Sequence, residues 1–341
     1  MRLTMFSAAL TSLICAAPPL LAEVPRVVAD TPVAHSLVSQ VMGDLGTPEI
    51  LLGQGSDPHH AQLRPSQARA IVRADLVVWT SADLSPWLDE VITSLAPDVA
   101  LELASVEGVY RQPYAESQLL AEADDHDDHD DHEGHDGHDD HDDHESHDDH
   151  EDDDHEGHDD HAGHDHEGDD PHQWMHPENA QVWIDAIAAQ LTELDPDNAA
   201  TYAENAANAR AAIDQLSSDI AAVLAPVQGV GLVMGHDAYG YFATRFDLNI
   251  LGSVAAGDAV DPSAARISAL RAALHEADAT CLFPEVNHPD AYVSLTAEDQ
   301  GLRLGTPLDP AGVMLEPGPA LYAESLMGLA RAFAECASRD G

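Results

Sequence analysis

The sequence of 341 residues contains no lysine, so all 13 of its basic residues are arginines. This absence excludes a Walker A phosphate loop, a lysine Schiff base and a Ser-x-x-Lys nucleophile pair, because each needs a lysine amine. The sequence contains 63 acidic residues, so its formal net charge is −50. This charge excludes nucleic acid and anionic membrane surfaces as partners. Long apolar runs are also scarce: beyond the N-terminal segment, no stretch approaches the ~20 apolar residues of a membrane span.

The N-terminal segment carries a single Arg and then an apolar run that ends in small residues, MRLTMFSAALTSLICAAPPLLA. This pattern predicts a secretory signal peptide over residues 1–22, with cleavage after Ala22. Cys15 raises the alternative of a lipid anchor, but the bulky Ile14 before it does not fit the usual acylation motif. The mature chain is therefore expected to be exported and soluble.

Two cysteines remain after that cleavage, Cys281 and Cys336. An even pair in an oxidising compartment favours a disulfide over two free thiols. A zinc-thiolate site is the alternative, but there is no third cysteine and neither thiol has a close partner in the sequence. A disulfide here closes a long loop, which is worth roughly 4 kcal/mol in the chain-entropy model.

Residues 124–170 form a low-complexity tract of Asp, Glu and His that divides the chain. The tract holds 14 of the 22 histidines and 26 of the 63 acidic residues, and Ala162 is its only apolar side chain. Such a segment buries too little surface to offset its conformational entropy, so it is predicted to be disordered. Histidines at three-residue intervals among carboxylates attract divalent transition metals. A solvated acidic linker is the alternative, although acidic residues alone would serve that purpose.

Short apolar runs alternate with amphipathic segments on both sides of the tract. Strands are expected at residues 26–29, 49–52, 76–79, 99–103, 231–234, 250–251, 280–283 and 302–305. Helices are expected at residues 33–45, 65–74, 86–95, 177–194, 196–224, 238–246, 261–277, 289–298 and 319–337. The alternation predicts an α/β fold of two (β/α) lobes with parallel sheets, each covered by helices on both faces.

The same pattern predicts the domain organisation. Five segments follow in order: signal peptide 1–22, N-terminal α/β lobe 23–123, His/Asp-rich tract 124–170, ligand segment with inter-lobe helices 171–228, and C-terminal α/β lobe 229–341. The second inter-lobe helix approaches 30 residues, or roughly 40 Å if it is continuous. A helix of that length is better suited to a rigid connection between lobes than to a flexible hinge.

Polar side chains outside the tract follow the ends of several expected strands. His59 and His60 lie on a Gly-rich loop after the second strand, and His172 lies where the tract ends. His236 directly follows the first strand of the second lobe, and Asp309 follows its last strand. Ligands of open parallel sheets bind outside the carboxyl ends of the strands, so these residues are expected to face a cleft between the lobes.

The remaining histidines outside the tract are interpreted differently. His35 and His275 lie inside expected helices and are read as ordinary surface or partly buried residues. His288 follows a strand end, but its Asn-His-Pro setting is typical of a helix cap. Glu285 leaves two alternatives open: it hydrogen-bonds a ligating imidazole, or it caps the following helix.

Three imidazoles with a carboxylate or water form a tetrahedral set that suits Zn²⁺. A single histidine is more often structural than ligating. Together with a metal-attracting tract in the same chain, the set favours a zinc site in the cleft.

Six short motifs, in this order along the chain, resemble the ZnuA-type zinc-binding components of bacterial zinc ABC importers, within family 9 of the bacterial solute-binding proteins. They cover essentially the whole mature chain. The motifs are Asp57-Pro58-His59 with Leu63-Arg64-Pro65-Ser66, Ala74-Asp75-Leu76-Val77-Val78-Trp79, Asp170-Pro171-His172-Gln173-Trp174-Met175-His176-Pro177, Gly235-His236-Asp237-Ala238-Tyr239-Gly240-Tyr241-Phe242, Thr280-Cys281-Leu282-Phe283-Pro284-Glu285 and Leu308-Asp309-Pro310-Ala311-Gly312. An acidic, His-rich insertion before the second ligand is also a mark of this branch.

The resemblance implies two lobes joined by a rigid helix, with one metal ion between them. It implies His59, His172 and His236 as ligands; the manganese branch of the family has a carboxylate where His236 stands. Some zinc members carry an acidic residue just before the first ligand, whereas this chain has Pro58. The fourth position is therefore left to Asp309 or water, with His60 as a further candidate. The pairing of Cys281 with Cys336 also matches a disulfide found in part of the zinc branch.

The function implied by the resemblance is capture of Zn²⁺ in the periplasm and its delivery to the permease and ATPase of a zinc ABC importer. A periplasmic zinc chaperone is a further expected partner, and the protein is expected to be a monomer that catalyses no reaction. Two alternatives stand beside this function: a periplasmic zinc buffer or storage protein, and a zinc-dependent hydrolase with Glu285 as its base. The hydrolase lacks support because the chain has no His-Glu-x-x-His motif.

Overall fold

The computed structural model describes residues 24–114, 168–255, 262–288 and 291–338. The predicted signal peptide lies outside these ranges, and so does the tract as far as residue 167. The cleavage predicted for the first and the disorder predicted for the second therefore stay predictions.

Two four-stranded parallel sheets form the centre of the two lobes. Their strand orders are β2-β1-β3-β4 and β6-β5-β7-β8, so both sheets have the same topology, and every strand pair is parallel. The strands are β1 (Val27–Ala29), β2 (Glu49–Ile50), β3 (Leu76–Trp79), β4 (Ala100–Glu102), β5 (Gly231–Met234), β6 (Ile250–Ser253), β7 (Ala279–Phe283) and β8 (Arg303–Leu304).

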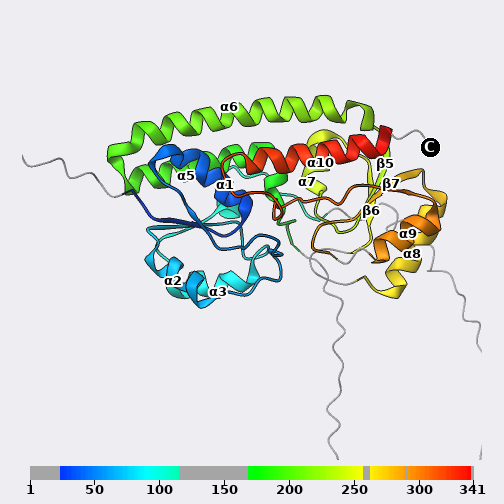
Figure 1. The fold of residues 1–341 in the computed structure, drawn as a ribbon, viewed down its shortest axis with the longest axis horizontal. Helices are drawn as coiled ribbons and strands as arrows, with labels where there is room; N and C mark the ends of the chain where they lie inside the picture. The colour runs from blue at the N-terminus through cyan, green and yellow to red at the C-terminus, as the bar shows by residue number, and fades with distance from the viewer. Residues whose placement is uncertain (1–23, 115–167, 256–261, 289–290, 339–341) are drawn as a thin grey trace, which may run out of the picture.

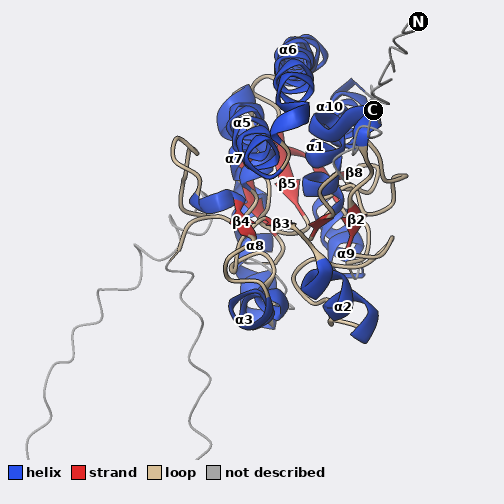
Figure 2. Ribbon diagram, turned by 90° about the vertical axis from the view of Figure 1, so that its left-hand side faces the viewer, coloured by secondary structure: helices blue, strands red, loops and turns tan. Residues whose placement is uncertain are grey.

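Helices cover both faces of each sheet (Figures 1 and 2). The described α-helices are α1 (Pro32–Met42), α2 (Pro65–Arg73), α3 (Pro86–Leu95), α5 (Pro177–Leu194), α6 (Ala199–Leu224), α7 (Gly240–Phe246), α8 (Ala264–Glu276), α9 (Ala291–Gln300) and α10 (Leu321–Ser338). In Figure 1, α5, α6 and α10 run along one side of the molecule, whereas α2 and α3 lie under one sheet and α8 and α9 under the other. The predicted α/β fold with two lobes is confirmed.

The hydrophobic core is arranged in three parts, and the largest part belongs to both lobes. Strand residues of one face, such as Val27 and Val78 of the first sheet and Leu232 and Phe283 of the second, pack together with α1, α5, α6 and α10. The opposite faces of the sheets have separate cores, formed with α2 and α3 in one lobe and with α8 and α9 in the other. Apolar side chains on both faces are what a sheet buried on both sides requires.

Capping residues and prolines fix where several helices begin and end. The side chain of Thr31 accepts a hydrogen bond from the backbone N–H of Ala34, and Pro32 occupies the first turn of α1, where a missing N–H is harmless. Gly43 ends α1 with a φ of 55°, a conformation that glycine adopts readily. The helix expected to reach residue 45 therefore stops at Met42, and a 3₁₀ turn covers Gly43–Leu45.

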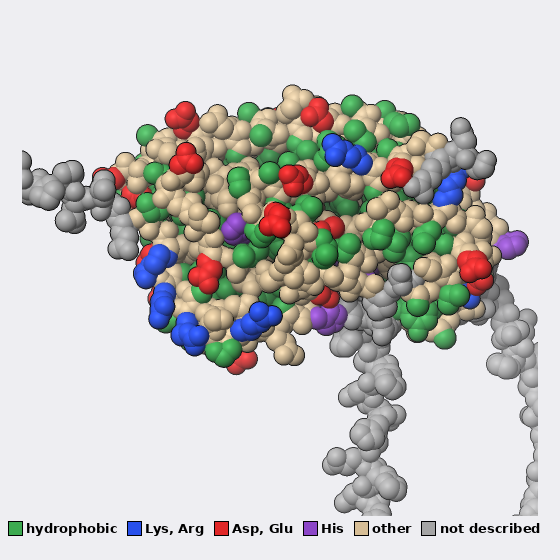
Figure 3. All heavy atoms as spheres, in the orientation of Figure 1, with side chains coloured by type: hydrophobic (Ala, Val, Ile, Leu, Met, Phe, Trp, Pro, Cys, Tyr) green, Lys and Arg blue, Asp and Glu red, His purple; other side chains and the backbone are tan. Residues whose placement is uncertain are grey.

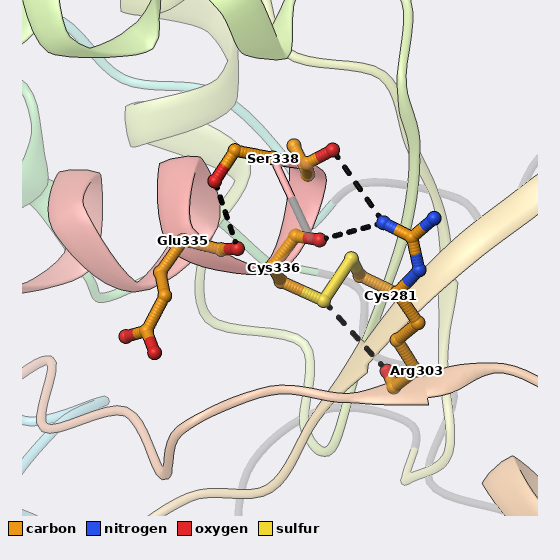
Figure 4. The surroundings of a disulfide bond; sticks show 6 residues. Cys281, Arg303, Glu335, Cys336 and Ser338 are labelled. Carbon is orange, nitrogen blue, oxygen red and sulfur yellow. Dashed lines mark hydrogen bonds between the residues drawn. A yellow bond between two sulfur atoms is a disulfide. The ribbon is translucent and has the colours of Figure 1, made fainter. Parts of the chain in front are cut away.

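Cys281 on β7 and Cys336 on α10 form the predicted disulfide, which ties the last helix to the second sheet (Figure 4). The Arg303 guanidinium donates a hydrogen bond to the carbonyl of Cys336 beside it. The two sulfurs are bonded to each other, so the zinc-thiolate alternative for these residues is wrong.

The surface differs in charge from place to place. On the face shown in Figure 3, acidic side chains are spread over the molecule, whereas arginines gather at the edge of the N-terminal lobe where α2 and α3 lie. In the described part of the chain, no helix combines the length and hydropathy that crossing a membrane requires.

Candidate metal centre

Three histidines from distant parts of the chain meet between the lobes. His59 comes from the loop after β2, His172 from the segment before α5, and His236 from the turn after β5. One ring nitrogen of each lies within 4.8 Å of the other two. The ring centroids are 5.4 Å apart for His59 and His172, 5.9 Å for His59 and His236, and 5.2 Å for His172 and His236. Tertiary structure thus brings together the three residues that the sequence places at strand ends or loops.

Local hydrogen bonds hold the loop that carries His59. The carboxylate of Asp57 accepts a hydrogen bond from the backbone N–H of His59 at 2.9 Å. The indole N–H of Trp87, on α3, donates to the carbonyl of Pro58 at 2.7 Å. The loop is therefore fixed both by its own Asx turn and by the helix beside it.

A buried carboxylate orients His172. Oδ1 of Asp170 lies 2.7 Å from Nδ1 of His172 and also accepts the backbone N–H of the same residue at 2.9 Å. Asp170 has no exposed surface, and His172 is only 2% exposed. Sequence composition assigns Asp170 to the His/Asp-rich tract, and its contact with His172 was not predicted; the spacing Asp-Pro-His was the signal that could have shown it.

Glu285 orients the ring of His236 as Asp170 orients that of His172. Its Oε2 lies 2.9 Å from Nδ1 of His236 and accepts a hydrogen bond from the Tyr239 hydroxyl at 3.1 Å. Burial by itself raises the pKa of Glu285, but the charge and hydrogen bond of His236 oppose it, and the net pKa shift is downward. Of the two alternatives for Glu285, the geometry favours the contact with an imidazole.

Asp309 lines the same cavity as the three histidines. Its two oxygens accept backbone N–H groups of Val313 and Met314, both at 2.9 Å. Burial raises the pKa of Asp309, and these hydrogen bonds oppose the shift only in part. The carboxylate therefore already has two donors, although each oxygen keeps a further lone pair.

Other candidate histidines lie outside this cluster. His60 is exposed, and its Nδ1 is 2.8 Å from Oδ2 of Asp57. His35 is buried on α1, where its ring nitrogen bonds the carbonyl of Pro48, and His275 is exposed on α8. Neither belongs to a metal-binding group of the described residues.

His288 is the one ring near this centre that sequence reasoning assigned elsewhere. Its ring stacks on that of His236, with centroids 5.1 Å apart and planes 16° from parallel. It lines the cavity with His59, His172 and Asp309. Asn287, just before it, has a φ of 65°.

A family model described as zinc-uptake complex component A, periplasmic (ZnuA), matches residues 27–336. The chain belongs to this family. The family's members are substrate-binding components of zinc ABC transporters, so the prediction of a zinc-binding transport protein that is not an enzyme is confirmed.

Individual relatives agree with this assignment. The high-affinity zinc uptake system protein ZnuA of Paracoccus denitrificans (strain Pd 1222) is 49% identical over 326 residues, which cover 95% of each chain. The protein of the same name from Brucella suis biovar 1 (strain 1330) is 36% identical over 306 residues, or 89% of each chain.

Solved structures share the fold. A crystal structure of ZnuA superimposes with a TM-score of 0.67 at 20% identity and covers 92% of this chain and 99% of that one. The periplasmic zinc-binding protein TroA from Treponema pallidum gives a TM-score of 0.70 at 16% identity, with coverage of 92% and 99%. At these identities the likeness concerns the fold alone.

Proposed function

We propose that His59, His172 and His236 together bind one Zn²⁺ ion between the lobes, and that this ion is the cargo that the protein delivers to its importer. The observation that carries the proposal is the approach of the three ring nitrogens to within 4.8 Å of one another. Three imidazoles are a usual protein ligand set for Zn²⁺, with a fourth position filled by another group.

The hydrogen bonds behind two of the rings support this geometry. An ionised carboxylate only accepts hydrogen bonds, so Nδ1 of His172 carries the proton that faces Asp170, and Nδ1 of His236 carries the proton that faces Glu285. Nε2 of each neutral ring then offers its lone pair to the ion. Carboxylates in this position also make the imidazole a stronger ligand.

The fourth position of the ion is Asp309 or a water molecule. Asp309 lies on the cavity wall, and a lone pair on each of its oxygens is still available. His60 is a poor fit, because its ring is exposed and engaged with Asp57.

Transport requires partners outside this chain. The family acts with the permease and ATPase of an ABC importer. We propose further that the protein works as a monomer in the periplasm, because one chain supplies all three histidines, and that a periplasmic zinc chaperone supplies it with zinc. The tract at residues 124–170 would hold additional ions weakly and raise their concentration near the cleft.

Calorimetry with Zn²⁺ tests the site. The intact protein is expected to bind one ion tightly and several weakly, and His59→Ala, His172→Ala and His236→Ala are each expected to weaken the tight binding at least ~100-fold. His275→Ala, an exposed histidine on α8, is the matched control and should leave it unchanged. Tight binding that survives all three cleft substitutions would contradict the proposal.

Reconstitution tests delivery. The zinc-loaded protein is expected to stimulate the ATPase of its importer in proteoliposomes, and the His172→Ala variant is expected not to do so at equal zinc. A loaded protein that binds zinc but never engages a transporter would instead indicate a zinc buffer.

A further inference from the structure

A second group of metal-ligating side chains overlaps the three-histidine cluster. Ligand atoms of His236, Glu285 and His288 also lie within 4.8 Å of one another. His236 belongs to both groups, so an ion that keeps this ligand has two alternative pairs of partners, His59 with His172 or Glu285 with His288.

Oε1 of Glu285 and Nε2 of His288 lie at a distance that suits an ion bound between them. Oε2 of Glu285 is engaged by His236 and Tyr239, whereas Oε1 lies 3.9 Å from Nε2 of His288. That separation is too long for a hydrogen bond. Two ligands of a tetrahedral Zn²⁺ ion are about 3.4 Å apart, since each bond is about 2.0–2.1 Å long. A shift of a few tenths of an ångström therefore lets one ion contact both atoms.

Backbone geometry places His288 there. Asn287 has a φ of 65°, in the left-handed region that asparagine tolerates better than most residues. The backbone N–H of His288 approaches the carbonyl of Glu285 at 3.4 Å and closes a tight turn after β7. This turn lays the ring of His288 parallel to that of His236.

Each group combines two buried side chains with one partly exposed histidine, His59 in the first group and His288 in the second. The side chains of His172 and His236 are 2% and 3% exposed, Glu285 is 7% exposed, and His288 is 26% exposed. The second group therefore reaches solvent through His288.

We propose that His236, Glu285 and His288 form an exchange position through which the ion passes between solvent and the His59–His172–His236 site. In this step the bonds from zinc to His59 and His172 break while bonds to Oε1 of Glu285 and to neutral His288 form, and no electron transfer or group transfer occurs. The proposal rests on the proposed cleft site. It adds a role for His288 that affects the rate of exchange and not the affinity, because the exchange position is sparsely occupied at equilibrium.

Stopped-flow transfer of Zn²⁺ from the loaded full-length protein to excess EDTA tests this role. His288→Phe keeps a ring to stack on His236 but removes the ligating nitrogen, and His288→Asn removes both ring and nitrogen. Both variants are expected to release the tight ion roughly 10-fold more slowly, with the dissociation constant within about twofold of the wild-type value. Ions held by the tract leave in a faster phase in every variant. His275→Phe is the matched control.

Two results would overturn the proposal. One is a release rate for both His288 variants equal to that of the wild type. The other is a dissociation constant weakened 10-fold or more, which would make His288 a permanent ligand. Failure of the cleft site itself looks different: the wild-type protein would then show no slow phase, and His59→Ala would release zinc with the same kinetics as the wild type.

Discussion

At the scale of single residues, Asp170 and Glu285 influence an ion held by the three histidines without binding it at that site. Both carboxylates are buried, and an ionised group in such surroundings is destabilised unless it is hydrogen-bonded. Asp170 receives two bonds through Oδ1, from the ring and the backbone of His172, whereas its Oδ2 has no hydrogen-bond partner within the described residues. This arrangement favours binding of a cation by the other ring nitrogen of His172. The positive charge of the cation would also stabilise the buried carboxylate of Asp170.

Neutral replacements of these carboxylates should weaken zinc binding while leaving the three ligands in place. Asp170→Asn and Glu285→Gln keep the size of the side chain but remove the charge that faces Nδ1. We expect each to raise the zinc dissociation constant roughly 10- to 100-fold, measured by competition with a chelator. Asp185→Asn, at an exposed ion pair with Arg210, is the control and should have no effect. Unchanged affinity in both site variants would show that the rings need no such support.

The affinity for zinc should also fall with pH. The ligating imidazoles must be neutral, and an ordinary histidine has a pKa of about 6.5, so protons compete with the ion below that value. Glu285 is not expected to add to this loss, because although burial raises its pKa, the charge and hydrogen bond of His236 hold that pKa below the ordinary value of a glutamate. We expect the affinity of the tight site to drop at least ~100-fold between pH 7.5 and pH 5 in calorimetric titrations. Tighter binding at pH 5 than at pH 7.5 would contradict imidazole ligation.

At the scale of elements, the disulfide connects a central strand with the terminal helix. Cys281 lies on β7, which carries Glu285 just beyond its end, and Cys336 lies on α10, which packs in the core shared by both lobes. The two cysteines are separated by 55 residues. The bond therefore restrains the unfolded chain strongly but lies away from the cavity of the metal centre, whose lining it does not join.

Removal of this bond should change stability and not zinc binding. The double variant Cys281→Ala with Cys336→Ala is expected to lose about 4 kcal/mol of unfolding free energy, from the entropy of closing a loop of this length. Urea unfolding of the zinc-free protein, followed by circular dichroism, measures the loss, and calorimetry measures the affinity. A variant of wild-type stability would show that α10 is held by packing alone.

At the scale of the whole molecule, the two lobes share one hydrophobic core. Buried residues of α5, α6 and α10 join strand residues from both sheets in a single cluster. An independent swing of one lobe would have to separate these packed side chains, which interiors resist. The metal centre is therefore expected to open by local rearrangement of loops and side chains and not by a large hinge motion.

Distance measurements between the lobes test this rigidity. Spin labels at cysteines introduced in place of Ser66 on α2 and Ser268 on α8 report the separation, because the two cysteines that remain after the predicted cleavage of residues 1–22 are already paired. We expect the mean distance to change by less than about 2 Å when zinc binds. The same label pair in the His172→Ala background controls for ions bound by the tract. A shift of several ångströms confined to the intact site would reveal a hinge.

Much of the architecture was predictable because it depends on local patterns. Short apolar runs such as Leu76–Trp79 and Gly231–Met234, in alternation with amphipathic segments, indicate strands of a doubly covered sheet, and prolines mark the starts of α2, α3 and α5. The candidate ligands followed from the rule that ligands meet the carboxyl ends of parallel strands. The role of His288 was not predictable in this way, since it depends on the φ of Asn287 and on a ring that lies 52 positions earlier in the chain.

The α/β class, the family and three histidines suited to zinc could be inferred from the amino-acid sequence, because periodicity, motif order and ligand chemistry are properties of short segments. The folded structure was needed to show which carboxylate hydrogen-bonds which ring, that the two lobes share a core, and that His288 lies beside His236. These features depend on contacts between residues far apart in the chain, and such contacts are set by how the two sheets and their common helices pack together.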